Sequence, residues 1–493
     1  MSHNLILVLL LANNLAALWL FCYGINAYWL VWRRHWGTNH IPPTLAEWPL
    51  VTVQLPIYNE YYVAQRLLQV VAALDYPRDR LQIQVLDDSK DQTQFLLQDM
   101  VTTLKNEGFQ VQYLHRQNRK GYKAGALAEG TYQASGEFIA IFDADFLPSS
   151  SWLKETLPHF QDPKTGAVQT RWGHINTDYS LLTRLQALGI DGHFNVEQQA
   201  RSRNNYFLNF NGTAGIWRKQ AILEGGNWQS DTLAEDMDLS YRVQLQGWRL
   251  QYVNEVVAPA ELPVAINAYK LQQCRWAKGS IQCARKLSRS VLWSRRSLQQ
   301  KIQALLHLTG YAVHPLMVVI LLLSWPLLRV EWVPHHPLSI VWGILMVPAT
   351  FGPPLLYVTA QRDLHPKSWI KQLGTVVLLA VLGTGISLSN TRAVFSALFN
   401  PTSTFRRTPK FDIRNRSDRW QDKRYVPTFD PVTFGELFLC WYAFQAASLA
   451  WELHAYGVLP FLLLYLFGYG YVGGLTLYQQ WQQYRQSFTA SRV

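Results

Sequence analysis

The chain carries an Asp-x-Asp pair, Asp143-Ala144-Asp145, shortly after the mostly apolar run Glu137–Ile141. We interpret this run as a buried strand, so the two carboxylates lie at its carboxyl end, where open α/β sheets bind ligands. Where the strand gives way to a loop, both carboxylates can reach one hard cation such as Mg²⁺ or Mn²⁺ that bridges to a diphosphate. The pair predicts a metal site for a nucleotide-activated substrate, although an acidic strand end is by itself a common pattern.

Two further strand ends carry side chains that suit a nucleotide. Tyr58 follows the predicted strand Val51–Leu55, and an aromatic ring there can stack on a base. Asp87 and Asp88 follow the predicted strand Gln82–Leu86, and a carboxylate there can accept a hydrogen bond from a base or ribose. Taken singly, Tyr58 also fits a core aromatic, and the acidic pair also fits a helix cap.

A cation for the phosphates is expected at Lys123. This lysine follows Gly121, where a helix is predicted to begin, and the free backbone N–H groups at a helix start favour anions. Gly121 and Gly125 also fit ordinary turn positions. The base, metal and phosphate candidates all fall at the same end of successive strands, and this convergence favours one donor-binding site.

Transfer to a hydroxyl also needs a general base. The stretch Thr232–Asp238 offers Glu235 and Asp236. We choose Asp236, because Glu235 can cap a helix or pair with a neighbouring arginine. The alternative is that both acids only stabilise a helix start, where negative charge is favourable.

A third group of residues suits an acceptor sugar and a diphosphate. In Gln272-x-x-Arg275-Trp276, the tryptophan offers a flat face for a sugar ring and the arginine offers a fork for a diphosphate. Gln272 falls on the same helical face. The alternative is an interfacial tryptophan beside an arginine that extends toward water.

Short apolar strands alternate with amphipathic helices over residues 45–260, which lack a long apolar run. This rhythm predicts an α/β fold with a mostly parallel sheet and helices on both faces. The predicted strands are Val51–Leu55, Gln82–Leu86, Val111–Leu114 and Glu137–Phe142, and helices follow Glu60, Asp91 and Gly121.

The composition predicts a membrane protein with basic aqueous surfaces. Of the 493 residues, 49% are hydrophobic and only 16% are charged, and the net charge is +12. The basic residues cluster beside apolar spans, as the positive-inside tendency expects, which argues against a nucleic-acid binder. Spans long enough to cross a bilayer lie near 5–31, 306–329, 338–360, 433–452 and 456–478.

The segment 369–398 is also apolar, but both of its flanks look cytosolic. Lys367 and Lys371 lie before or within its start, and a run of arginines and lysines over 406–424 follows it. We therefore expect this segment to enter and leave on one side or to lie in the interface, with a sixth crossing as the alternative. Residues 285–303, which are basic and amphipathic, suit an interfacial helix.

These residues together resemble family 2 inverting glycosyltransferases of the processive, membrane-bound kind, the cellulose and hyaluronan synthase group. The short sequence segments around these residues resemble those of plant cellulose-synthase-like mannan and glucan synthases. The segment Phe405–Lys410 resembles the gating loop of cellulose synthases. The family's aspartate pair, DxD, TED-type and QxxRW motifs are matched by Asp87-Asp88, Asp143-x-Asp145, Glu235-Asp236 and Gln272-x-x-Arg275-Trp276.

The resemblance implies a GT-A nucleotide-sugar-binding fold and a role for each motif. It implies donor binding by Tyr58, Asp87, Asp88, Lys123 and Asp143, metal binding (Mg²⁺ or Mn²⁺) by Asp143 and Asp145, catalysis by Asp236, acceptor or diphosphate contacts by Gln272, Arg275 and Trp276, and gating by Phe405, Thr408 and Lys410. The chain departs from the pattern in two places: Ala234 replaces the threonine of the TED triplet, and Arg406-Arg407 stand where an apolar residue is usual.

The resemblance therefore implies an inverting, processive glycosyltransferase that polymerises hexose from GDP-mannose or UDP-glucose into a β-linked mannan, glucomannan or glucan and exports it. The alternative is a non-processive enzyme that makes a glycolipid such as glucosyl-ceramide or glucosyl-diacylglycerol. The partners of the glycan synthase would be the nucleotide sugar, the growing glycan and membrane lipids, and nucleic acid is not expected. Assembly into a homo-oligomer is left as an open alternative.

The expected location is a multi-pass membrane protein with a cytosolic catalytic domain, in a plasma membrane in preference to a Golgi membrane. The expected organisation is an amino-terminal transmembrane helix (1–35), a GT-A domain (45–284), an interfacial helix (285–303), a transmembrane pair with a re-entrant or interfacial segment (304–398), a gating segment (399–432) and a second transmembrane pair (433–480).

Overall fold

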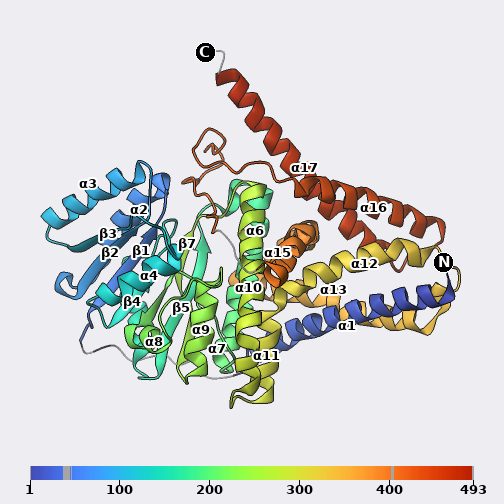
Figure 1. Cartoon of the computed structure of the whole chain (residues 1–493), viewed down its shortest axis with the longest axis horizontal. Helices are drawn as coiled ribbons and strands as arrows, with labels where there is room; N and C mark the ends of the chain where they lie inside the picture. Colours follow the sequence, from blue (N-terminus) through green and yellow to red (C-terminus); the bar gives the residue numbers. More distant parts are fainter. Residues whose placement is uncertain (1, 37–44, 46, 401–404, 491–493) are drawn as a thin grey trace.

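The structure is a computed structural model that describes residues 2–36, 45, 47–400 and 405–490. A sheet domain lies at one end, and long helices extend from it to the other (Figure 1). The segment 401–404, inside the predicted gating segment, lies outside the described residues.

The sheet has seven strands in the order β3-β2-β1-β4-β6-β5-β7. Every neighbouring pair is parallel except the two that involve β6, which runs antiparallel to β4 and β5. The prediction of a mostly parallel α/β sheet is therefore confirmed. The strands are β1 (Val51–Ile57), β2 (Leu81–Asp87), β3 (Gln110–His115), β4 (Phe138–Ile141), β5 (Thr165–His174), β6 (Gly215–Arg218) and β7 (Arg249–Ala260).

Helices cover both faces of the sheet, so even polar side chains of the inner strands, such as Gln54 and Gln84, are fully buried. Val63 and Leu67 of α2 pack on one face together with side chains of α3 and α5. Leu127 of α4 packs on the other with side chains of α8 and α9. The helices are α2 (Tyr61–Ala72), α3 (Thr93–Asn106), α4 (Tyr122–Gln133), α5 (Trp152–Thr156), α8 (Lys219–Glu224) and α9 (Glu235–Leu245).

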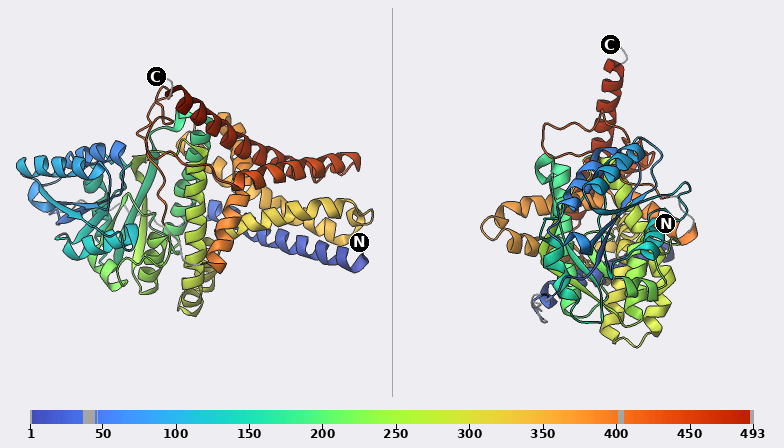
Figure 2. Two further views of the ribbon diagram at one scale, coloured as in Figure 1. Left: turned by 45° about the horizontal axis from the view of Figure 1, so that its top comes forward. Right: turned by 90° about the vertical axis from the view of Figure 1, so that its left-hand side faces the viewer.

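A layer of helices separates the sheet from the long apolar helices, with α10 running through it (Figure 2). Its members are α6 (Leu181–Gly192), the π-helix η4 (His193–Gln198), α7 (Gln199–Arg203), α10 (Ile266–Trp293) and α11 (Leu298–Leu308). The stretch 285–303, expected to form one interfacial helix, is divided between α10 and α11, and its place at a membrane interface stays a prediction. The Ser297 hydroxyl accepts from the Gln300 backbone N–H in a capping box, which starts a new helix after the break.

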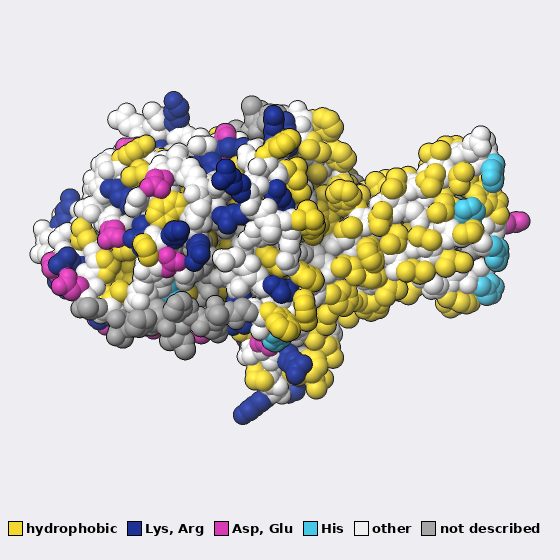
Figure 3. All heavy atoms as spheres, turned by 90° about the horizontal axis from the view of Figure 1, so that it is seen from below, with side chains coloured by type: hydrophobic (Ala, Val, Ile, Leu, Met, Phe, Trp, Pro, Cys, Tyr) yellow, Lys and Arg dark blue, Asp and Glu magenta, His cyan; other side chains and the backbone are white. Residues whose placement is uncertain are grey.

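The remaining helices form an apolar bundle. The face of it seen in Figure 3 is mainly hydrophobic, with histidines at its far end, whereas the sheet domain carries many charged side chains. These helices are α1 (His3–Arg33), α12 (Val313–Leu328), α13 (Pro337–Leu364), α14 (Leu373–Gly385), α15 (Ser387–Phe399), α16 (Val432–Glu452) and α17 (Leu459–Ala490).

Four helices in the described part of the chain are long and apolar enough to cross a membrane: His3–Arg33, Gly310–Leu328, Pro337–Leu364 and Leu459–Arg485. A fifth span is formed if Trp369–Gly385 and Ser387–Phe399, which meet at a bend of 47°, count as one. This bend suits a re-entrant loop or a broken span, so the path of 369–398 stays a prediction. The predicted crossing at 433–452 corresponds to α16, which is not among the four and also stays a prediction.

Close helix contacts in the bundle depend on glycine. A Cβ on Gly24 of α1 would lie 2.3 Å from the backbone oxygen of Pro348 in α13, and one on Gly352 would lie 2.5 Å from the Gly24 oxygen. Small residues let apolar helices approach closely, as membrane helices often do. This contact joins α1, which precedes the sheet domain, to α13, which follows it.

Candidate active site

One cleft lies at the carboxyl ends of β1, β2, β4 and β5, bordered by the start of α9, by α10 and by the segment 405–410. It brings together all but one of the residues predicted from the sequence: Tyr58, Asp88, Lys123, Asp143, Asp145, Asp236, Gln272, Arg275, Trp276, Phe405, Thr408 and Lys410. The cleft is therefore the candidate active site.

Asp87 is the predicted site residue outside the lining of this cleft. Its side chain is fully buried, where it accepts hydrogen bonds from the Tyr113 hydroxyl (2.7 Å) and the Ser89 backbone N–H (2.8 Å). The Nδ1 atom of His115 lies 3.1 Å from the same carboxylate. Asp87 thus holds the ends of β2 and β3 together, and the adjacent Asp88 presents its carboxylate to the cleft.

One end of the cleft combines an aromatic ring with two arginines. The Arg119 guanidinium lies 3.4 Å from the centre of the Tyr58 ring. Arg116 donates to both oxygens of Asp88, from Nε at 2.7 Å and from Nη2 at 2.5 Å. Because Asp88 is already paired, it acts here as a fixed acceptor whose orientation is set by Arg116.

Each of the two DxD carboxylates contacts a lysine. Lys123 Nζ lies 2.5 Å from Asp143 Oδ1 and also donates to the Gly212 carbonyl at 2.9 Å. Lys410 Nζ lies 2.5 Å from Asp145 Oδ2. Burial alone would lower the pKa of Lys123, but the nearby carboxylates of Asp143 and Glu235 outweigh it and raise the pKa.

The Asp143 and Asp145 carboxylates fit a divalent metal that takes its other ligands from a diphosphate and water. Mg²⁺ and Mn²⁺ prefer such oxygen ligands and often bind through only one or two carboxylates plus substrate phosphates. No group of three or more metal-ligating side chains occurs in the described ranges, so an all-protein metal cage is not present there. In this structure Lys123 and Lys410 neutralise the two carboxylates that would bind such a metal.

The segment 405–412, which includes the predicted gating residues, is held in the cleft by residues that the sequence analysis did not assign to the site. The Glu261 carboxylate accepts from the backbone N–H groups of Phe411 (2.9 Å) and Asp412 (2.8 Å). Arg407 lies 3.7 Å from Glu60. Burial raises the pKa of both glutamates to about 7, so each is sensitive to the charges that the segment supplies.

Phe405 closes the same side of the cleft. Its ring stacks against Tyr122 at 5.8 Å between centroids, and the Arg275 guanidinium lies 4.9 Å from its centre. The cavity that remains is about 160 Å³. Ligand sites for molecules of drug size occupy about 300–1,000 Å³, so the cleft is narrow in this arrangement of the segment.

Asp236 occupies the first turn of α9, beside Gly212. The Met237 backbone N–H donates to Asp236 Oδ1 at 2.8 Å, and a Cβ on Gly212 would lie 3.0 Å from Oδ2. Gly212 has a φ of +83°, so glycine suits both the backbone and the space. Burial, and next the neighbouring charge of Glu235, raise the pKa of Asp236 to about 7, a value suited to a general base.

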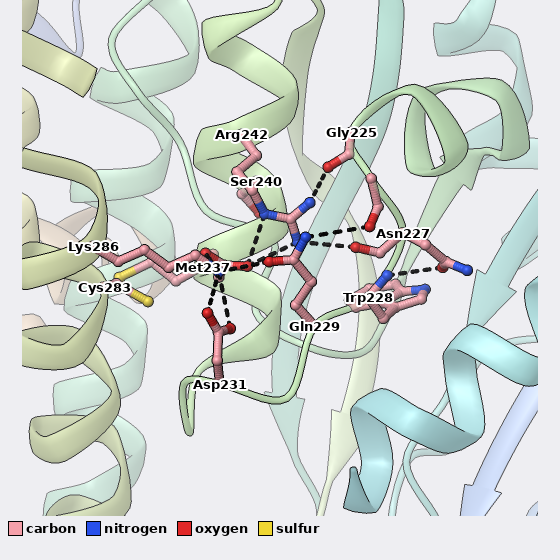
Figure 4. Close-up of polar contacts among 12 residues, drawn as sticks. Gly225, Asn227, Trp228, Gln229, Asp231, Met237, Ser240, Arg242, Cys283 and Lys286 are labelled. Atoms are coloured by element: carbon pink, nitrogen blue, oxygen red, sulfur yellow. Dashed lines mark hydrogen bonds and ion pairs between the residues drawn. The ribbon is translucent and has the colours of Figure 1, made fainter. Parts of the chain in front are cut away.

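A network behind Asp236 fixes the start of α9 to its neighbours (Figure 4). The fully buried Asp238 pairs with Arg242 of the same helix at 2.8 Å and with Lys286 of α10 at 2.9 Å. Lys286 also donates to Gln229 at 2.7 Å, and Arg242 donates to the Asn227 carbonyl at 2.9 Å. These contacts hold the turn of α9 that carries Asp236 against α10, which carries Gln272, Arg275 and Trp276.

Glu60, Arg119 and Glu261 are among the site residues that sequence reasoning missed. Glu60 lies two positions after Tyr58, and Glu261 directly follows the last residue of β7. An acid next to a strand end was the available signal. Their partners lie some 150 to 350 positions along the chain, which no local pattern reports.

The fold and the cleft define a GT-A-like glycosyltransferase, and comparisons with known proteins give the family. A family profile described as "Glycosyltransferase like family 2" matches residues 49–279. The "Probable glucomannan 4-beta-mannosyltransferase 2" of Oryza sativa subsp. japonica is 33% identical over 452 residues, which cover 87% of this chain and 76% of that protein. The chain belongs to the family 2 glycosyltransferases, in the branch of the plant cellulose-synthase-like enzymes.

Two further comparisons agree. The "Glucomannan 4-beta-mannosyltransferase 9" of Arabidopsis thaliana is 35% identical over 370 residues, which cover 73% of this chain and 64% of that protein. Among solved structures, "Mannosyltransferase PcManGT from Pyrobaculum calidifontis in complex with GDP-Man and Mn2+" has a TM-score of 0.53 at 20% identity, covering 80% of this chain and 99% of that one. At this identity the second comparison supports the fold alone.

Proposed function

We propose that this protein is an inverting β-mannan or glucomannan synthase that transfers mannose from GDP-mannose to the end of a growing glycan. The observation that carries the proposal is the single cleft in which base, diphosphate, catalytic and acceptor candidates converge. The preference for mannose rests on the relatives named as glucomannan 4-beta-mannosyltransferases. UDP-glucose is the second donor to test.

The donor would lie across the carboxyl ends of β1, β2 and β4. Tyr58 and Arg119 would contact the base, and Asp88 would accept from the base or ribose. Lys123 would contact the diphosphate, since it starts α4, where backbone N–H groups also favour an anion. A divalent metal held by Asp143 and Asp145 would supply charge neutralisation to the leaving diphosphate.

Asp236 would remove the proton from the acceptor hydroxyl as that oxygen attacks the sugar carbon. Attack on the side opposite the diphosphate inverts the configuration at that carbon. Trp276 would stack on the acceptor sugar, with Gln272 and Arg275 beside the diphosphate. Phe405, Thr408 and Lys410 would withdraw to admit a donor and then close over it, so that water is excluded.

Processive growth and export would follow from the position of the cleft against the apolar helices. The layer that contains α10 lies between the sheet and these helices (Figure 2), and residues of α10 line the cleft. A glycan that leaves the cleft through this layer would enter the bundle. In this arrangement the sheet domain is cytosolic and the bundle crosses a plasma membrane. A homo-oligomer is not required for any of these steps.

The test is transfer of labelled mannose from GDP-mannose by the full-length protein in membranes, with Mn²⁺ or Mg²⁺, followed by solvent extraction. A labelled polymer that resists extraction and is cleaved by a β-mannanase supports the proposal. A solvent-extractable product indicates the glycolipid-forming alternative. Asp236→Asn should abolish incorporation, while Asp178→Asn, at a largely exposed aspartate outside the cleft, should not.

A further inference from the structure

A histidine that the mechanism above does not use also lines the cleft. His174 is the last residue of β5, and its side chain borders the same space as Trp172 and Ile190. Its Nε2 atom lies 2.9 Å from Asp191 Oδ1 on α6. Both side chains are largely buried, at 9% and 12% exposed.

Asp191 is in turn held by a helix of the apolar bundle. The Gln361 side-chain amide on α13 donates to Asp191 Oδ2 at 2.9 Å. Gln361 is 4% exposed and lies within the candidate span Pro337–Leu364. The three residues form a chain of hydrogen bonds from the cleft to the bundle: His174, Asp191 and Gln361.

This chain fixes the hydrogen-bonding character of the imidazole. An ionised carboxylate is acceptor-only, so the Nε2 atom of His174 must be the donor to Asp191. In the neutral ring the other nitrogen, Nδ1, is then an acceptor. In the described part of the chain Nδ1 has no hydrogen-bond partner, so it is available to bind a hydroxyl group.

The position of His174 in the sheet places it on the acceptor side of the reacting sugar. Base-binding residues follow β1 and β2, and the metal carboxylates follow β4. In the strand order β3-β2-β1-β4-β6-β5-β7, the strand that ends in His174 lies beyond β4, away from the base. Since the acceptor attacks opposite the diphosphate, it would approach from the β5 side of the cleft, which His174 lines.

We propose that His174 binds a hydroxyl group of the acceptor sugar through Nδ1, and that Asp191 and Gln361 are positioning residues that fix its tautomer and orientation. The proposal rests on the proposed function. The ligand is the terminal hexose of a glycan, recognised as a hydrogen-bond donor. Oriented histidines of this kind are usually fixed by the partner of their other nitrogen.

The test compares how much nucleoside diphosphate is released with how much sugar is incorporated. An acceptor held out of place lets water react with the donor, so the ratio of GDP released to mannose incorporated rises. His174→Ala should raise this ratio by about three- to tenfold, the range expected for one lost hydrogen bond. Asp191→Ala should raise it in the same direction.

Two variants make the comparison specific. His174→Gln should bring the ratio back toward the wild-type value, because a glutamine amide can donate to Asp191 and accept from the sugar. Asp162→Ala is the matched control, since this aspartate pairs with Arg249 near the opposite end of β5. The amount of each variant in membranes is measured in parallel.

The inference is overturned if His174→Ala leaves the ratio unchanged, or if release and incorporation fall in equal proportion, as a purely structural role would produce. A wild-type protein that incorporates sugar from neither GDP-mannose nor UDP-glucose overturns the proposed function, and the inference with it. A changed ratio with intact rescue by His174→Gln supports both.

Discussion

Removal of the charge at Glu235 should shift the pH dependence of catalysis by Asp236. Burial raises the pKa of Asp236 from its ordinary 3.8 to about 7, and the next largest cause is the neighbouring Glu235 carboxylate. A general base works only when deprotonated, so kcat/KM for the wild-type enzyme should fall about tenfold per pH unit below about pH 7. Glu235→Gln removes a like charge, so the pKa of Asp236 should fall. The acidic limb of the pH profile, where kcat/KM declines, should then move to lower pH.

The size of the shift follows from Coulomb's law. Two unit charges about 6–8 Å apart repel by roughly 2–3 kcal/mol at an effective dielectric constant of about 20, and about 1.4 kcal/mol corresponds to one pH unit. Burial also raises the pKa of Glu235, so this group is not fully ionised and its effect is reduced. We therefore expect the limb to move by about one pH unit.

The assay is GDP release at low donor concentration from about pH 5 to about pH 9, because kcat/KM reports the pKa values of the free enzyme. Glu137→Gln is the control, since Glu137 lies at the amino end of β4 and pairs there with Arg218 at 2.7 Å. The reasoning is refuted if the limb stays in place or moves to higher pH in Glu235→Gln. Loss of the limb in that variant, with an active Asp236→Asn, would make Glu235 the base.

Three other predictions concern the metal, the gating segment and the bundle. Chelation should abolish transfer and Mn²⁺ or Mg²⁺ should restore it, and Asp145→Asn should raise the half-saturating metal concentration by at least about tenfold. Lys410→Gln removes a cation from Asp145 and should lower the half-saturating metal concentration about threefold while it reduces kcat; an unchanged metal titration would contradict this. Lys270 and Glu436 are fully buried and 2.9 Å apart, so Lys270→Met should cost about 3–5 kcal/mol of stability in thermal inactivation, and Lys270→Met with Glu436→Leu should cost much less.

The chemistry at the strand ends could be predicted because it depends on local patterns. The segments that form β1, β2 and β4 are short and rich in β-branched and other apolar residues, and parallel strands bring their carboxyl ends to one edge. Tyr58, Asp88 and the DxD pair therefore meet in the cleft as expected. Asp87 differs from its neighbour because alternate side chains along a strand point to opposite sides, and its carboxylate meets Tyr113.

The contacts between distant segments could not be predicted. Glu261 holds the backbone of Phe411 and Asp412 about 150 positions along the chain, and Gln361 reaches Asp191 from 170 positions away. Such pairs are formed when the bundle packs on the sheet domain, and their sequence spacing carries no periodic signal. The split of 285–303 between α10 and α11 depended on one capping serine, which a hydrophobicity pattern does not weigh.

The most direct test of the central claim is the linkage of the product that the purified full-length protein makes from labelled GDP-mannose and a divalent metal. The proposed function predicts an extraction-resistant polymer of β-linked mannose that is absent with Asp236→Asn. A lipid-extractable product, or a polymer formed equally well by Asp236→Asn, would contradict it.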